Sequence, residues 1–575
     1  MLTPEYLATF PDYIVQLFEQ YDAFVVEDFA RRVAKAAGVT DTAEWQAIRS
    51  NEMGLSMDEL TKRSAELLDI TQDELKTMYK QAYDTYIESD EKRFTGSGLN
   101  YQRIVNNPVL KDYMTAAQEQ TQRALQNILG HTGAIKSMTG TTAVMLKYGN
   151  QYMPISKAYT MAMDLAQMQV STGVLDYNTA IRNAVKAISK QGVSTVIGDA
   201  VGYDSGYRIS VRAAARMCVL TGVNQMAGNM NKLVCDDLGL DLVETTAHMG
   251  ARPSHQVWQG QIFSLSGRSK KYPSLVEGTG YGTVSGLMGA NCRHNYYGYY
   301  EGSPRAYTDQ QLYEMSDAGA PHIKYEGREY TYYEATQKQR QMERTIIATK
   351  RELIGYNAAG DEEAFTAASI KLRGQKSRYM EFSKKANLLP RTEQIQQDGY
   401  DRVISGKSSY TSTNYHKTWL KSIGAESTSL NTLKKYNFAK ENDTLEYRLL
   451  RRYADDVTTG WISPMVGFEN YIKTYNDIQS NIVGQTTSNG ILISSQSRHF
   501  LQRVMGTRAD PNTGRSRSGV SIADIEDALF HTKRYGKIVT RSDGKNSLKF
   551  YGNSCIVSIN PDTGELIQVN PWKED

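Results

Sequence analysis

Apolar residues recur every three to four positions along most of the first 235 residues, which is the spacing of one face of an α-helix. The pattern predicts helices over 75–94, 108–130, 155–171, 178–190 and 206–233. Two Ser/Thr-x-x-Glu sequences, Ser56 to Glu59 and Thr71 to Glu74, have the form of capping boxes, so we expect helices to begin there. On the last predicted helix, three arginines four apart share one face, which is solvated in most helices and binds a partner in some: Arg208, Arg212 and Arg216.

A second helical block follows a segment with a different residue pattern. From 240 to 303, glycine is frequent and the helical period disappears. Thr331 to Glu334 then forms another Ser/Thr-x-x-Glu sequence, and the helical pattern continues to about 385 with a break over 357–360. In the second arm, apolar residues seven apart predict a helical hairpin with a packing seam: Phe365, Leu372 and Tyr379.

The C-terminal residues change period again. Short helices are predicted over 499–505 and 522–530, the second capped by Ser521, and the β-branched runs that follow predict an antiparallel β-meander. The predicted fold class is therefore multidomain: a mainly α body with a small irregular core rich in Gly, His and Cys, plus a C-terminal α+β domain. The predicted divisions are a helical body (1–235), the Gly/His/Cys-rich segment (236–303), the helical hairpin (304–390), a polar linker or subdomain (391–475) and the α+β domain (476–575).

Composition narrows the class of protein. The chain of 575 residues has 66 Lys and Arg against 63 Asp and Glu, yet residues 1–100 hold 19 acids and 10 bases whereas residues 498–549 hold 11 bases and 5 acids. The basic segment is the one that could meet a polyanion. No apolar run reaches the roughly 18 residues of a membrane span, and the N-terminus lacks the basic region of a signal peptide. Four widely spaced cysteines do not make a disulfide framework, so we expect a reducing cytoplasm as the place of synthesis.

The densest group of metal-binding side chains lies in the glycine-rich segment. His248, His255, Cys292 and His294 are the side-chain types that bind zinc. One residue separates Cys292 from His294, fewer than in most structural zinc pairs, but on an extended strand both would face the same side. The residues allow a zinc site, structural or enzymatic, or a core crossed by hydrogen-bonded histidines. P-loop, HExxH and GxSxG sequences are absent from the chain, which argues against ATP or dinucleotide use.

Longer literal segments resemble a known family. GARPSHQVWQG, TGYG and GLMGANCRH, with the helical VRAAARMCVLTGVNQMAGNMNKL and YYEATQKQRQMERTIIATKREL, are similar to sequences of the phage minor capsid protein 2 family, related to the Mu F-like head morphogenesis proteins. The resemblance covers about residues 1–400. It implies a virion protein made in the host cytoplasm, present in few copies near the portal, with portal and capsid proteins as partners. Mu F-like relatives carry more Cys and His in this region, where the matching positions here are His248, His255, Cys292 and His294.

The basic C-terminal domain has candidate chemistry of its own. A histidine base with arginines can cleave RNA without a metal, because the base takes the 2′-OH proton and the cations stabilise the phosphorane. SRHFLQRVMGT and the strand sequences within 488–575 resemble the phage-associated branch of the barnase–EndoU–colicin–RelE-like nucleases. That resemblance implies His499 as general base or acid, Arg503 as a phosphate contact and Ser547 as a polar partner, with Arg498 beside them. Nucleic-acid contacts are predicted at Arg515, Arg517 and Arg534.

Two functions remain open for this domain. One is a delivered, metal-independent ribonuclease with RNA as its substrate and an immunity protein as a further partner. The other is a purely structural virion protein whose C-terminal domain binds nucleic acid or protein without catalysis, with His499 and Arg503 on a solvated helix face. The sequence therefore leaves open whether the chain is an enzyme. His531 at a helix end and Cys555 in an apolar strand are predicted to be structural.

Overall fold

The computed structural model describes residues 2–37, 42–94, 106–129, 144–148, 151–190, 192–197, 207–506, 518–541 and 544–572. The chain divides into two compact units, Met1–Ser408 and Ser409–Asp575, each with its own hydrophobic core. The divisions predicted from the sequence are finer than these two units and stay a prediction. Within the described ranges, none of the helices has both the length and the hydropathy of a membrane span.

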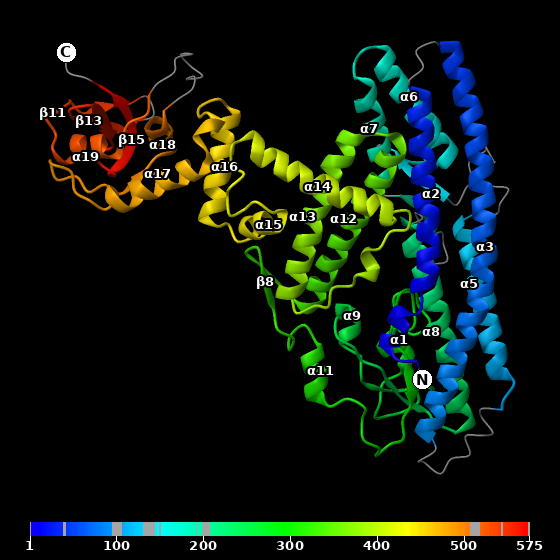
Figure 1. Ribbon diagram of the computed structural model, residues 1–575. Coiled ribbons are helices and arrows are strands. Elements are labelled where there is room, and N and C mark those ends of the chain that lie inside the picture. Colours follow the sequence, from blue (N-terminus) through cyan, green and yellow to red (C-terminus); the bar gives the residue numbers. More distant parts are fainter. Residues whose placement is uncertain are drawn as a thin grey trace. The chain divides into compact units, whose positions relative to one another are not determined.

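Four long helices lie side by side in the first unit (Figure 1). They are α2 (Asp12–Ala37), α3 (Thr42–Phe94), α5 (Val109–Leu129) and α8 (Val211–Asp237). Each packs on two of the others, in the order α2, α3, α5, α8 and back to α2, so their apolar faces enclose one core. Buried tyrosines of α3 add polar contacts: the hydroxyl of Tyr79 lies 2.6 Å from that of Thr121, and Tyr86 donates to Asn231 at 2.8 Å.

Smaller elements complete this body. The helices α6 and α7 pack on α2 and on each other, and α1 contacts α8. Four strands form an antiparallel sheet in the order β2, β1, β3, β4. The bounds are α1 (Pro4–Thr9), β1 (Val144–Tyr148), β2 (Gln151–Pro154), α6 (Ile155–Ser171), α7 (Tyr177–Ser189), β3 (Val193–Ile197) and β4 (Tyr207–Ser210).

A helical hairpin packs against the body. It consists of α12 (Tyr332–Ala359), which contacts α2 and α7, and α13 (Glu362–Lys385), followed by the short 3-10 helix η2 (Glu393–Ile395). The predicted capping box is present at Thr331, and Gly360 ends α12 in the left-handed conformation at φ 72°. The apolar residues predicted for the seam are buried: Phe365, Leu372 and Tyr379.

The glycine-rich segment folds around a core of its own that includes Trp258, Phe263 and Tyr296. Three strands form an antiparallel sheet in the order β6, β5, β7. A Cβ added to Gly286 would lie 2.0 Å from the carbonyl oxygen of Gly280, so the loop after α10 needs glycine there. The bounds are β5 (Leu242–Thr245), α9 (Pro253–Gln256), β6 (Ile262–Ser264), α10 (Leu275–Thr279), β7 (Tyr296–Gly298), α11 (Asp309–Met315), β8 (Ile323–Tyr325) and β9 (Arg328–Tyr330).

The second unit joins a group of helices to a small sheet. Its sheet has the order β10, β15, β14, β13, β11, with β12 on β13, and every pairing is antiparallel except β10 with β15. Helices α18 and α19 cover one face of it. The helices are α14 (Arg402–Ser422, whose first residues precede the unit), α15 (Leu433–Glu441), α16 (Leu445–Thr458), η3 (Pro464–Val466), α17 (Phe468–Asn481), α18 (Arg498–Met505) and α19 (Ile522–Phe530). The strands are β10 (Ser495–Gln496), β11 (Arg534–Tyr535), β12 (Val539–Thr540), β13 (Asn546–Tyr551), β14 (Cys555–Ile559) and β15 (Glu565–Pro571).

The predicted fold class is confirmed: a mainly helical body, a small irregular core and a C-terminal α+β region. The capping boxes predicted at Ser56 and Thr71 are wrong, because α3 runs through both without a break. The hydroxyl of Ser56 donates to Asp28 of α2 at 2.5 Å, and that of Thr71 donates to the carbonyl oxygen of Leu67 one turn back at 2.6 Å.

Candidate functional site

Three of the four predicted metal ligands meet in the glycine-rich segment of the first unit. His255 lies in the short helix α9, and Cys292 and His294 lie in the chain that leads into β7. All three side chains are buried. Their ligand atoms all lie within 4.8 Å of one another.

The helix α8 holds this chain segment through one buried amide. The Nδ2 of Asn224 donates to the carbonyl oxygens of both Cys292 and His294, at 2.9 Å in each case. Its Oδ1 accepts from the Nδ2 of Asn295 at 2.8 Å. Asn224 is fully buried, so its hydrogen bonds fix the backbone of two ligands relative to the helix.

The distances between the three ligand atoms fit a tetrahedral zinc ion. The Nδ1 of His255 lies 3.4 Å from the Nδ1 of His294. The Sγ of Cys292 lies 3.8 Å and 3.7 Å from these two nitrogens. Zn–N bonds of about 2.05 Å and Zn–S bonds of about 2.3 Å at tetrahedral angles give edges of about 3.4 Å and 3.6 Å. The residues present therefore fit three ligands of one zinc ion, with one coordination position left for another ligand.

The outer ring nitrogens support the same assignment. The Nε2 of His255 lies 2.8 Å from the carbonyl oxygen of Ser285, and the Nε2 of His294 lies 3.1 Å from the Oε1 of Gln259. Because both oxygens are acceptors, Nε2 carries the proton in each ring and Nδ1 keeps its lone pair. Two lone pairs therefore meet beside the cysteine sulfur, and carbonyl-anchored imidazoles of this kind are typical of metal-bound histidines.

Burial sets the protonation of the three groups. Desolvation lowers the pKa of His255, and desolvation with the neighbouring His248 lowers the pKa of His294 well below its ordinary value. Burial also raises the pKa of the Cys292 thiol. The neutral imidazoles are in the form that binds a metal, whereas the thiol must lose its proton on binding.

His248, the fourth predicted ligand, does not join the other three. Its ring stacks on that of His294 with centroids 4.4 Å apart. Its Nδ1 lies 3.1 Å from the Nη2 of Arg293 and 2.9 Å from the carbonyl oxygen of Met249. Desolvation and the positive charge of Arg293 lower the pKa of His248 to about 3. Its place in the structure is therefore that of a neutral ring against a ligand.

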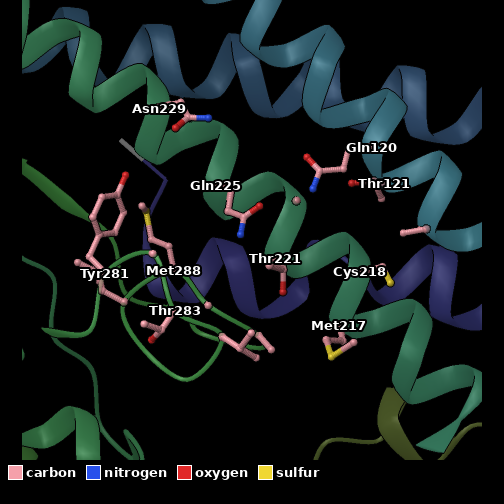
Figure 2. A pocket seen from close by; sticks show the side chains of 17 residues that line it. Gln120, Thr121, Met217, Cys218, Thr221, Gln225, Asn229, Tyr281, Thr283 and Met288 are labelled. Atoms are coloured by element: carbon pink, nitrogen blue, oxygen red, sulfur yellow. The ribbon is translucent and has the colours of Figure 1, made fainter. Parts of the chain in front are cut away.

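A cavity of 480 Å³ lies nearby, between α5, α8 and the loop 281–290. Figure 2 shows Thr221 and Gln225 on α8 together with Met288 on that loop. The thiol of Cys218 also lines it, and burial raises the pKa of this thiol to about 11. A protonated thiol is a poor nucleophile, so the cavity adds no reactive group to the candidate site.

In the second unit, α18 carries His499 and Arg503 one turn apart. The Nε of Arg503 donates to the Nε2 of His499 at 3.3 Å, and the Nδ1 of His499 lies 3.3 Å from the Oε1 of Gln502. The guanidinium of Arg503 also lies 5.8 Å from the ring centroid of Trp461, which meets the His499 ring edge-on. The lone pair of the His499 Nε2 therefore faces the guanidinium of Arg503.

Arg498, at the start of the same helix, is part of an ion-pair network. It pairs with Asp455 and with the fully buried Asp456, whose Oδ1 accepts from the Nε of Arg498 at 2.7 Å. Asp456 also accepts from the Nε2 of Gln502 at 2.6 Å and from the hydroxyl of Tyr471 at 3.2 Å. The charge of Arg498 is thus compensated inside the unit, so the arginine joins α18 to α16.

The remaining predicted residues of this domain lie elsewhere. Ser547 of β13 pairs with Val539 of β12, and the side chains of Leu548 and Phe550 on β13 are part of the core that includes residues of α18. Because side chains alternate along a strand, Ser547 faces away from α18, and the structure does not bring it to His499. Arg534 lies over the ring of Tyr551 at 4.3 Å. Arg515 and Arg517 lie outside the described residues. His531 ends α19 and Cys555 is fully buried.

Sequence reasoning missed the residues that position the candidate metal ligands. Asn224, Gln259 and Ser285 supply an amide and two acceptor oxygens from three separate elements. A polar amide at a core position of a predicted helix was the available signal for Asn224, because buried amides need partners. Ser285 makes its contact through its backbone carbonyl oxygen, which every residue type has, so the sequence gives no signal for it.

Comparisons with known proteins agree on a phage origin for the relatives of this chain. The family described as "Phage minor capsid protein 2" matches residues 2–383, which cover nearly all of the first unit and all three candidate ligands. A protein described as "Structural protein" from Lactococcus phage LL-H is 25% identical over 154 residues, or 26% of this chain. The match spans 40% of that relative's length. No solved structure matches the chain.

Proposed function

The chain belongs to the phage minor capsid protein 2 family and is thus a virion structural protein, and from this we propose that it is a head component present in few copies near the portal. The family match over residues 2–383 carries the proposal, because it covers the helical body and the hairpin as well as the candidate ligands. Portal and capsid proteins are its proposed partners. The second unit lies beyond the match and carries a separate proposal below.

Quantitative mass spectrometry and cross-linking of purified phage particles test this placement. We expect the chain at a small fraction of the major capsid protein's abundance, with cross-links from its first unit to the portal protein. An abundance equal to that of the major capsid protein, or cross-links confined to tail proteins, would contradict the proposal.

We also propose that zinc is a structural component of the first unit. His255, Cys292 and His294 would hold it, and a bound ion would connect α9 to the chain before β7. A metal that joins loop segments contributes folding free energy directly. The support is the match between the three ligand distances and tetrahedral edges, together with the two carbonyl-type acceptors behind the imidazoles.

For the second unit, RNA cleavage by His499 with Arg503 is a further candidate function. The contact of 3.3 Å between them on α18 supports it, because it places an imidazole that can act as a base beside a guanidinium that can stabilise the phosphorane. Arg498 and Ser547 have other contacts, so they leave the proposed catalytic set. Binding of nucleic acid or protein without catalysis is the alternative, and Arg534 against Tyr551 is its main support. An immunity protein is a partner only under the first of these.

A further inference from the structure

Six arginines line one cavity of 500 Å³ in the first unit: Arg212, Arg216, Arg293, Arg340, Arg344 and Arg391. Three carboxylates share the lining, those of Asp12, Glu343 and Glu393, so cations outnumber anions around it. The other lining groups include Ser210 and Asn291, whose side chains can donate hydrogen bonds. The cavity therefore carries a local excess of positive charge inside a chain that is almost neutral as a whole.

The arginines come from separate elements that the fold brings together. Two lie one turn apart on α8, and two lie one turn apart on α12. Arg391 follows α13, and Arg293 stands between two candidate metal ligands. Like charges one turn apart destabilise a helix, and here two such pairs face one cavity. Such an arrangement is costly unless an anion compensates it.

Internal ion pairs compensate only three of the six. Arg212 pairs with Glu19 at 2.6 Å, Arg216 with Asp12 at 2.9 Å, and Arg391 with Glu343 at 2.7 Å. Within the described part of the chain, no carboxylate forms an ion pair with the three remaining arginines. Those three are Arg293, Arg340 and Arg344.

The pKa of Arg340 is consistent with an excess of positive charge around the cavity. Arg340 lines the cavity from α12, and its side chain is exposed there. Partial desolvation, with the charges of Arg391, Arg293 and Arg216, lowers the pKa of Arg340 to about 10. The guanidinium stays charged at neutral pH, but its neighbours oppose that charge. An anion in the cavity would relieve the repulsion.

A smaller cavity of 240 Å³ continues the positive region. It shares Asn291, Arg293 and Arg340 with the arginine cavity and adds Arg252. The described residues that line it include no carboxylate. An anion in the arginine cavity therefore meets cations on the side of the histidine and cysteine cluster as well.

We propose that the arginine cavity binds a phosphate monoester or inorganic phosphate through Arg293, Arg340 and Arg344. Arginine forks match phosphate oxygens geometrically, and a phosphate dianion offers several acceptor oxygens to guanidiniums that come from different directions. A single carboxylate would compensate one charge only. The cavity volume lies in the usual range of small-ligand sites, roughly 300–1,000 Å³, so a mononucleotide also fits by size. The inference depends on neither the portal position nor the zinc.

The test uses the full-length protein and thermal unfolding at constant ionic strength. The probes are inorganic phosphate, adenosine monophosphate and a 5′-phosphorylated single-stranded oligonucleotide, with adenosine and the unphosphorylated oligonucleotide as uncharged-end controls. The variants are Arg340→Gln and Arg344→Gln, matched by Arg123→Gln on α5, whose side chain is 71% exposed. Isothermal titration then measures affinity for each probe that raises the melting temperature.

We expect at least one phosphate-bearing probe to stabilise the wild type and Arg123→Gln, with roughly ten- to hundredfold weaker binding by Arg340→Gln, the usual loss for a hydrogen bond to a charged group. Without a probe, Arg340→Gln and Arg344→Gln should melt at or above the wild-type temperature, because each substitution removes repulsion. Stabilisation by phosphate and the mononucleotide identifies a small-molecule source, and stabilisation by the phosphorylated oligonucleotide alone identifies a nucleic-acid end. Equal responses in all four proteins, or none in the wild type, would overturn the proposal.

Discussion

Replacing Asn224 with alanine should both destabilise the first unit and loosen its candidate metal centre. The side chain makes three hydrogen bonds inside the core, two to the carbonyls of Cys292 and His294 and one from Asn295. Each buried hydrogen bond contributes about 1 kcal/mol, and the partners left without a bond add to the cost, so we expect a loss of about 3–4 kcal/mol. For a unit of about 400 residues, with an unfolding entropy near 0.8 kcal/mol/K, this lowers the melting temperature by roughly 4–5 °C.

The assay is differential scanning calorimetry of the full-length protein, with zinc affinity measured by competition against a chromophoric chelator. Because Asn224 fixes the ligand backbone, zinc affinity should fall roughly 10–100-fold, as for other residues that orient ligands. Asn229→Ala is the matched control, since Asn229 is exposed on the same helix, and it should change neither quantity. A melting temperature within 1 °C of the wild type together with unchanged zinc affinity in Asn224→Ala would refute the reasoning.

Three further outcomes test other parts of the molecule. Cys292→Ser should reduce bound zinc from about one per chain to well below that by elemental analysis, whereas Cys235→Ser, at another buried cysteine, should retain it; equal zinc in both variants would exclude the assigned ligand. Burial raises the pKa of Glu19 to about 7 in the folded state from 4.5, so its contribution is complete below pH 4.5 and is lost as the pH rises through 7. Glu19→Gln should therefore flatten the fall in urea stability between pH 5 and 8 by up to about 3 kcal/mol, and the exposed Glu27→Gln on the same helix should not. Full-length protein incubated with bacterial RNA and EDTA should cleave it and His499→Ala should not, if the second unit is a ribonuclease; intact RNA in both reactions favours binding without catalysis.

The helices of the body were predictable because their apolar period is local. The predicted span 155–171 is the observed α6, and the hairpin begins at the predicted capping box of Thr331 and breaks at Gly360, within the predicted 357–360. The failures at Ser56 and Thr71 have a tertiary cause. A hydroxyl that can cap a helix can also donate to a carboxylate on a neighbouring helix or to a carbonyl oxygen of its own preceding turn. In the long helix α3, Ser56 donates to Asp28 of α2, and Thr71 donates to the carbonyl oxygen of Leu67.

The arginine stripe on α8 shows a different limit of local reasoning. Spacing correctly predicted that Arg212 and Arg216 share a helix face, but the prediction was wrong for Arg208, which lies in strand β4 before α8 begins at Val211. Spacing also could not say what covers that face. The partners are Glu19 and Asp12, seven residues apart on α2, where the helical period aligns them with the two arginines. Their pairing with α8 is a property of helix packing, so neither helix reveals it alone.

The candidate metal ligands were predictable by residue type, whereas their grouping in space was not. Zinc chemistry selected four side chains, and the structure brings together His255, Cys292 and His294 while His248 stacks on the side. Which of the histidines joins the group depends on the short helix α9 and on the loop that carries Ser285. Neither segment has a periodic pattern of apolar residues that would predict its conformation. Residue chemistry can thus nominate ligands, whereas the turn geometry that selects among them becomes visible only in three dimensions.

Arg293, the residue between Cys292 and His294, connects the candidate zinc site with the arginine cavity. A zinc ion with one thiolate and two neutral imidazoles keeps a net charge of about +1. Arg252, Arg293 and Arg340 line the adjoining cavity, and the residues described around it offer no carboxylate to balance them. A neutral fourth ligand would leave four positive charges close together, so the electrostatics favour an anion at that position. Because only one residue separates Cys292 from His294, that residue, Arg293, lies beside the position where an anionic fourth ligand would be bound.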